Sequence, residues 1–218
     1  MLPPNTPVCV VVCTLASIMP VTALLISEER SIVKAAYTYS AQTLLLVGVF
    51  IALGFKYYWF FIWACTASVT KVFLAPYIIV WAARKTGRVE EVERPVLPRV
   101  ASVALMVAII IAGYFIASTY VRMPDTVPLG VSVALTLLGL FLITTRRNLL
   151  KQIFGFLHFE NGAHLTLAVL APSIPETIDA GIATDAIVLV LILAVLAIEI
   201  HKSLKTLDVS SLTMLKHS

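Results

Sequence analysis

Long apolar runs separated by short polar segments make up most of this chain, and the pattern predicts seven membrane-spanning helices. A helix needs roughly 20 apolar residues to cross ~30 Å of hydrocarbon, and a backbone exposed to lipid must satisfy its own hydrogen bonds. The sequence therefore predicts an all-α, polytopic membrane helix bundle. The predicted spans cover residues 7–26, 35–54, 57–83, 100–120, 128–145, 149–171 and 180–200.

The composition agrees with this pattern and excludes an ordinary soluble domain. Of 218 residues, 60% are apolar and 13% are charged, and little sequence remains outside the spans. Residues 1–20 have no basic residue before their apolar run and no small-residue cleavage site after it. We therefore expect the first span to be retained rather than removed as a signal peptide.

Lysine and arginine are distributed unequally between alternate loops. Nearly all of them belong to the loops of one side, whereas the other side holds Lys56 and Arg122, and Lys71 lies inside the third span. Because basic loops remain in the cytoplasm, we expect the N-terminus outside and the C-terminus in the cytoplasm. The net charge of +4 then reflects topology and requires no nucleic-acid partner.

The longest loop, within residues 83–99, carries charges of both signs and two prolines, which is typical of a connector between units. We expect residues 1–99 to form a three-helix membrane segment with this connector. Residues 100–218 would form a four-helix segment with a cytoplasmic tail.

Two charged residues are expected at the centre of the membrane. Glu160 lies in the segment RRNLLKQIFGFLHFENGAHL, ~18 Å of helix beyond the two arginines, and Lys71 lies at a similar depth in the third span. Buried charges are costly and usually face a protein interior or a water-filled path. Lys71 and Glu160 are therefore expected to pair, either as a proton-handling pair or as a static ion pair that fixes helix packing.

Two further residues are candidates for handling protons. His164 follows Glu160 by four residues and shares its helix face, so that the two can exchange a proton. Asp185 lies in the last span, ~9 Å from its outer end. We predict a proton path that contains Glu160, Asp185, Lys71 and His164.

Other residues in the spans favour packing roles. Gly155 and Gly162 lie on one face, where they would let a neighbouring helix approach closely. Pro76 frees a carbonyl near Lys71, which would either kink the span or hydrate the site. No motif for a zinc, haem, iron–sulfur or phosphate site is present, so no cofactor or catalytic centre is expected in this chain.

The segments TKVFLAPYIIVWAARK, ENGAHL and GIATDA resemble the component E family of hydrogenase-4, the formate-hydrogenlyase type of membrane-bound [NiFe] hydrogenase, over nearly the whole length. The last three spans, about 128–200, are similar to the K-type subunit of respiratory complex I. The latter resemblance implies two membrane glutamates on consecutive helices. Asp185 falls on the second position, whereas the first falls on Leu157, three residues before Glu160.

The resemblance implies a membrane-arm subunit of a complex I-like hydrogenase in a bacterial or archaeal inner membrane. It implies antiporter-like membrane subunits, a membrane anchor subunit and peripheral subunits with nickel–iron and iron–sulfur centres as partners. The assembly would couple hydrogen metabolism to ion translocation. The alternatives are a subunit of a multi-subunit sodium/proton antiporter, a purely structural membrane subunit and, last, an independent transporter, for which no internal repeat is visible.

Overall fold

The computed structural model describes residues 6–90, 96–120, 126–170 and 176–210, with the backbone alone at 120 and 176–186. Within these ranges every regular element is a helix and no β-strand is present. The helices are α1 (Pro7–Glu28), α2 (Ile32–Gly54), α3 (Phe60–Ala67), the π-helix η1 (Ser68–Leu74), α4 (Ala75–Lys85), α5 (Arg99–Tyr120), α6 (Thr126–Thr145), α7 (Leu149–Leu170) and α8 (Glu176–Leu204).

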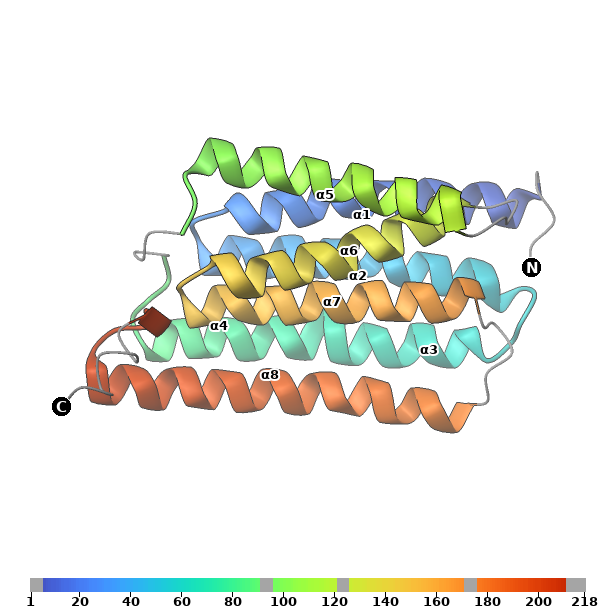
Figure 1. The fold of residues 1–218 in the computed structure, drawn as a ribbon. Helices are drawn as coiled ribbons and strands as arrows, with labels where there is room; N and C mark the ends of the chain where they lie inside the picture. Colours follow the sequence, from blue (N-terminus) through green and yellow to red (C-terminus); the bar gives the residue numbers. More distant parts are fainter. Residues whose placement is uncertain (1–5, 91–95, 121–125, 171–175, 211–218) are drawn as a thin grey trace.

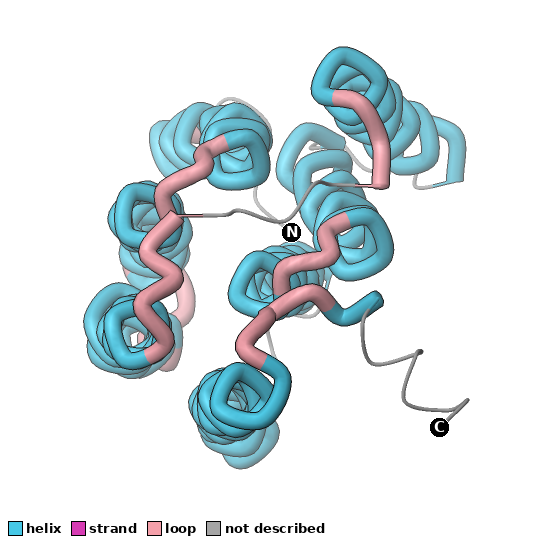
Figure 2. The backbone as a smooth tube through the Cα atoms, turned by 90° about the vertical axis from the view of Figure 1, so that its left-hand side faces the viewer, coloured by secondary structure: helices cyan, strands magenta, loops and turns pink. Residues whose placement is uncertain are grey.

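The helices run side by side along one axis, and α3, η1 and α4 follow one another as a single rod (Figure 1). Seen along the axis, they form two rows (Figure 2). One row contains α1, α2 and the α3–η1–α4 rod, and the other contains α5, α6, α7 and α8. The rows pack against each other mainly through α1 with α6 and α4 with α8, while α2 contacts α7 between them.

Six helical segments are long and apolar enough to cross a membrane, namely α1, α2, the α3–η1–α4 rod, residues 99–119 of α5, α6 and residues 187–204 of α8. The predicted all-helical membrane fold is confirmed for these six. Helix α7 is more polar, although it lies between α6 and α8 in the middle of its row (Figure 2). Thirteen of its 22 residues are buried, which means that protein rather than lipid surrounds its polar face.

The close contact between α6 and α7 depends on glycine. A β-carbon on Gly155 would lie 2.8 Å from the Gly139 carbonyl oxygen, and one on Gly162 would lie 2.7 Å from the Ser132 carbonyl oxygen. Both distances are shorter than real β-carbon contacts. The predicted packing role of Gly155 and Gly162 is confirmed, because only glycine permits this approach.

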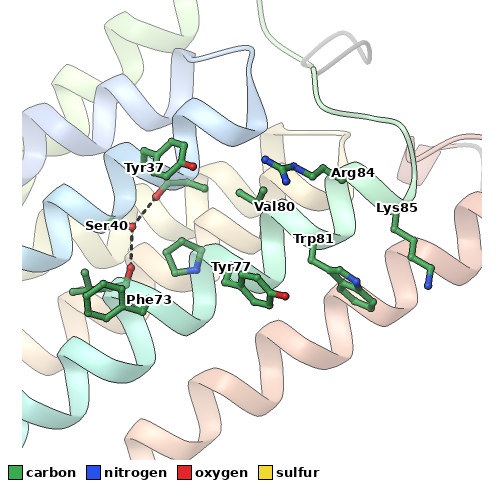
Figure 3. A pocket seen from close by; sticks show the side chains of 11 residues that line it. Tyr37, Ser40, Phe73, Tyr77, Val80, Trp81, Arg84 and Lys85 are labelled. Atoms are coloured by element: carbon green, nitrogen blue, oxygen red, sulfur yellow. Dashed lines mark hydrogen bonds between the residues drawn. The ribbon is translucent and has the colours of Figure 1, made fainter.

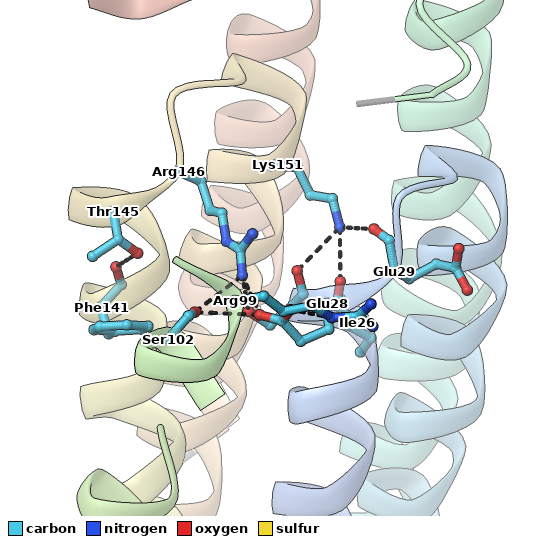
Figure 4. Close-up of polar contacts among 10 residues, drawn as sticks. Ile26, Glu28, Glu29, Arg99, Ser102, Phe141, Thr145, Arg146 and Lys151 are labelled. Carbon is cyan, nitrogen blue, oxygen red and sulfur yellow. Dashed lines mark hydrogen bonds and ion pairs between the residues drawn. The ribbon is translucent and has the colours of Figure 1, made fainter. Parts of the chain in front are cut away.

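One end of the bundle contains a buried ionic cluster (Figure 4). Arg146 follows α6 and donates to the Glu28 carboxylate at 2.6 Å and to the Ser27 hydroxyl at 3.0 Å. Lys151, at the start of α7, donates to the carbonyls of Ile26, Ser27 and Glu29 at the end of α1. A helix end has carbonyls without intrahelical partners, and the buried ammonium satisfies them.

Two basic residues of this cluster are buried, although they lie near the predicted ends of membrane spans. The exposed fractions of Arg146 and Lys151 are 4% and 0%. Glu28 provides the compensating negative charge, and Arg99 adds a second contact to it at 3.1 Å. The two basic residues therefore join the end of α1 to the turn between α6 and α7.

Candidate functional site

The site lies between the two rows, midway along the bundle. The Lys71 ammonium is 2.8 Å from the Glu160 carboxylate, and the exposed side-chain fractions are 2% and 16%. Lys71 is the twelfth residue of the α3–η1–α4 rod and Glu160 is the twelfth of α7. Each is ~16 Å from the start of its helix. The sequence pattern placed both residues at a similar depth, and the contact between them was expected for that reason.

Two neighbouring side chains of α7 also contact Lys71. The ammonium donates to the Asn161 side-chain oxygen at 3.2 Å and lies 3.1 Å from His164 Nδ1. A buried ammonium needs such partners, because burial without hydrogen bonds costs several kcal/mol. One turn of α7 therefore supplies a carboxylate, an amide and an imidazole to the same lysine.

His164 Nδ1 has two partners that require opposite protonation. It lies 2.9 Å from the Glu160 backbone carbonyl, which only accepts a hydrogen bond, and 3.1 Å from Lys71, which donates when charged. A protonated Nδ1 satisfies the carbonyl and a bare Nδ1 accepts from the ammonium. The site therefore offers two alternative hydrogen-bond arrangements that differ by the position of one proton.

The π-helix η1 carries Lys71. Pro76 follows it and has no N–H to donate to the Val72 carbonyl one turn earlier. Instead, the Ser40 hydroxyl of α2 donates to that carbonyl at 3.0 Å. The carbonyl freed by Pro76 is therefore bonded to protein in this structure. π-helical segments occur frequently at functional sites, and this one faces Glu160.

Several buried polar groups around the pair were not anticipated as site residues. The Tyr39 hydroxyl of α2 lies near Glu160, Thr43 and Asn161, and the Tyr39 ring packs 6.3 Å from His158. The sequence contained the signal, because Tyr39, Gln42 and Thr43 are polar residues inside an apolar span.

Within the described residues, the polar atoms of this region that are buried without a hydrogen bond of normal geometry include Tyr39 Oη, Thr43 Oγ1, His158 Nε2 and Asn161 Nδ2. Buried polar groups are usually satisfied, and exceptions indicate ordered water or a function that changes their partners. The interior between α2 and α7 is thus more polar than helix packing requires.

A small cavity adjoins the other side of Lys71. It has a volume of about 10 Å³ and is lined by Thr66, Thr70, Lys71 and His164, together with aromatic and alanine side chains. This volume is close to the minimum that one water needs, and the hydroxyls and ammonium provide partners. The Lys71 and His164 side chains therefore border a space that can hold a water molecule.

The remaining predicted site residue, Asp185, belongs to α8, and its side chain lies outside the described residues. Leu157 is 1% exposed in the core. Among the described residues, no group of three or more His, Cys, Asp and Glu could hold a metal ion. The structure thus brings Lys71, Glu160 and His164 together and provides no side-chain geometry for Asp185.

Comparison with known proteins gives a match over nearly the full length. The chain is 37% identical over 212 residues to hydrogenase-4 component E of Escherichia coli (strain K12), covering 94% of this chain and 97% of that protein. The chain belongs to the hydrogenase-4 component E family. The protein of the same name from Shigella flexneri matches equally well.

The component E match extends beyond the part shared with respiratory enzymes. Residues 127–217 match the family described as NADH-ubiquinone/plastoquinone oxidoreductase chain 4L. An uncharacterized protein of Mycobacterium tuberculosis is 21% identical over 149 residues, covering 67% of this chain and 68% of that protein. No solved structure matches. Lys71 lies outside the chain 4L region, whereas Glu160 and His164 lie within it.

Proposed function

We propose that this chain is an integral membrane-arm subunit of a multi-subunit, complex I-like [NiFe] hydrogenase of the hydrogenase-4 type. The nearly full-length similarity to hydrogenase-4 component E supports this assignment, and the chain 4L match supports a place in the membrane arm. Six membrane-compatible helices leave no separate domain for a redox centre within the described residues. Hydrogen chemistry and its electron transfer would occur in partner subunits.

We propose that α7 also crosses the membrane, so that the chain has seven spans. Helix α1 begins and α8 ends at opposite ends of the bundle (Figure 1), as an odd number of crossings requires. The end with the basic loops would face the cytoplasm according to the positive-inside rule. The N-terminus would then lie outside, in a bacterial or archaeal inner membrane.

The partners would be antiporter-like membrane subunits, a membrane anchor subunit, and peripheral subunits that hold the nickel–iron and iron–sulfur centres. Formate is a candidate electron donor for the assembly, which would be a formate-hydrogenlyase type. The chemistry of this chain would be limited to its own titratable side chains. These side chains can accept and release protons.

Within the assembly, Glu160, Lys71 and His164 would form part of a proton path, with Asp185 as a further member. A proton arriving at the pair would neutralise the carboxylate and weaken its attraction for Lys71. His164 Nδ1 would then be positioned to receive a proton from the ammonium, because it lies 3.1 Å away. Transfer of the Glu160 proton to the neutral Lys71 amine would restore the ionised pair, and the His164 imidazolium would pass its proton onward.

The observation that carries this mechanism is the joint contact of Lys71 with Glu160 and His164. A static ion pair needs one acid and one base, whereas this lysine also meets an imidazole whose nitrogen has two incompatible partners. The two incompatible partners of His164 Nδ1 favour a site whose hydrogen bonds change during turnover.

Membership in a hydrogenase is tested by purification. The chain, expressed with an affinity tag in its native host, is extracted in mild detergent, and the co-purifying proteins, nickel content and hydrogen-dependent dye reduction are measured. An untagged strain provides the control. We expect nickel, iron–sulfur proteins and antiporter-like subunits to be enriched together. Antiporter-like subunits without nickel, or a chain that purifies alone, would contradict the assignment.

A further inference from the structure

A groove on the surface of the bundle is lined by residues of α2, η1 and α4. It has a volume of about 720 Å³ and lies between α2 and the η1–α4 part of the third rod (Figure 3). Its walls include four aromatic side chains, Tyr37, Phe73, Tyr77 and Trp81, which are 65%, 70%, 69% and 38% exposed. These rings face the surroundings of the bundle rather than its core.

The two ends of the groove differ in polarity. The inner end lies near the middle of the rod, where Ser40 bonds the Val72 carbonyl. The outer end is bordered by Arg84 and Lys85 in the last turn of α4, and the Lys85 ammonium lies 5.5 Å from the Trp81 ring centroid. Among the described residues, neither cation forms an ion pair with an acidic side chain, in contrast to Arg99 and Arg146.

The dimensions favour a thin, elongated occupant. From Phe73 to Lys85 the groove follows ~18 Å of helix, which is about half the thickness of a bilayer with its head groups. An acyl chain fits such a groove, while a charged head group would reach the end that carries the cations.

We propose that this groove binds one phospholipid with an anionic head group, whose acyl chain lies along the aromatic wall and whose phosphate contacts Arg84 and Lys85. Basic pockets between helices on the cytoplasmic side bind anionic head groups in this way. Aromatic rings near the head-group level suit the boundary between the chain and its polar end. The proposal concerns a surface outside the proton site and does not require hydrogenase activity.

The bound lipid would also be in contact with η1. Val72 and Phe73 line the groove and directly follow Lys71, whose side chain is on the buried face of the same segment. An acyl chain against Phe73 would therefore support the π-helical segment from the lipid side. This provides a physical connection between membrane composition and the position of Lys71.

The first test compares phospholipids retained by the native complex, purified through this chain, for the wild type and for Arg84→Gln/Lys85→Gln. Arg30→Gln/Lys202→Gln is the control, because it removes the same charge from two exposed residues that do not line the groove. Native mass spectrometry counts the bound lipids and identifies their head groups. We expect the wild type and the control to retain the same amount of anionic phospholipid. The groove variant is expected to retain roughly tenfold less of it. Equal retention in all three proteins would overturn the proposal.

A second test identifies the occupant directly and does not depend on charge removal. The photoreactive residue p-benzoylphenylalanine replaces Tyr77 or, as a control on another outward face, Ile111, which is 64% exposed. Irradiation of membranes followed by mass spectrometry of the chain is expected to reveal an anionic phospholipid adduct at position 77 and mixed lipids at position 111. A peptide from a partner helix at position 77, or the same mixed lipids at both positions, would overturn the proposal.

Discussion

The Lys71 ammonium and the Glu160 carboxylate are 2.8 Å apart at the centre of the bundle. The first residue belongs to the π-helix η1 in one row and the second to α7 in the other row. Their contact joins the N-terminal helices to the region that matches the chain 4L family. The N-terminal helices of this chain therefore contribute a charged residue that contacts the interior of that region.

Removing one member of this pair is expected to be more harmful than removing both. Lys71→Met leaves a carboxylate without its ammonium, and breaking a buried pair costs about 3–5 kcal/mol. Lys71→Met/Glu160→Met removes both charges and is expected to recover much of the loss. Thermal unfolding of the purified chain in its complex measures this. If the loss of stability in the double variant equals the sum of the losses in the two single variants, the two residues do not stabilise each other.

Ser40 and Pro76 are expected to be coupled through the Val72 carbonyl. Ser40→Ala removes the hydroxyl that bonds this carbonyl and should cost about 1–3 kcal/mol, the penalty of an unsatisfied buried group. In a Pro76→Ala background the restored N–H can bond the same carbonyl, so that Ser40→Ala should cost much less. A double-mutant cycle on unfolding free energies measures the difference. Equal costs in both backgrounds would contradict this account of the segment.

The contact between α6 and α7 predicts strong intolerance of a methyl group at Gly139. A β-carbon there would lie 2.5 Å from the Phe159 nitrogen and 2.6 Å from the Gly155 carbonyl oxygen. These are backbone atoms that cannot move away, so Gly139→Ala should cost at least the ~1–3 kcal/mol typical of overpacking.

Gly48→Ala is the matched control for Gly139→Ala, since its β-carbon would meet a movable Leu15 methyl group. The amount of folded chain in membranes and its melting temperature are the measurements. A Gly139→Ala protein as stable as the Gly48→Ala protein would contradict the described packing.

The ionic cluster at the basic end predicts a further stability effect. Lys151→Met removes a buried ammonium that bonds three carbonyls at the end of α1. Hydrogen bonds to charged groups contribute about 1.5–3 kcal/mol, and a loss of at least this size is expected in unfolding experiments. Lys202→Gln is the control, because its pair with Glu199 is exposed and such pairs contribute at most ~1 kcal/mol. Similar losses for both variants would refute the structural role of Lys151.

The sequence pattern predicted the helices and the depth of Lys71 and Glu160, because both follow from the lengths of apolar runs. It could not predict that Arg146 and Lys151 are buried, since charges near span ends are ordinarily solvated. That outcome depends on Glu28 and on three carbonyls at the end of a distant helix. Tyr39 and Asn161 were also missed as neighbours of the pair, because helix rotation determines which polar residues meet and apolar spans reveal little about rotation.

The π-helix is a second feature that the pattern did not reveal. Its sequence, SVTKVFL, has the same apolar character as the flanking α-helices, and Pro76 alone predicted only a freed carbonyl. The Ser40 hydroxyl that bonds this carbonyl lies on another helix. Such long-range partners become visible only when the two helices are placed side by side.

The most direct test of the proton path is proton translocation by inverted membrane vesicles that contain the complex with Glu160→Gln. Glutamine retains the shape and an acceptor for Lys71 but does not ionise, and the exposed Glu199→Gln, with a side chain 59% exposed, is the control. Assembly is verified first by the subunit content and hydrogenase activity of each complex. We predict that Glu160→Gln assembles and translocates at least tenfold fewer protons per hydrogen turned over, whereas Glu199→Gln is unchanged. Normal translocation in an assembled, active Glu160→Gln complex would contradict the proposed role of the Lys71–Glu160 pair.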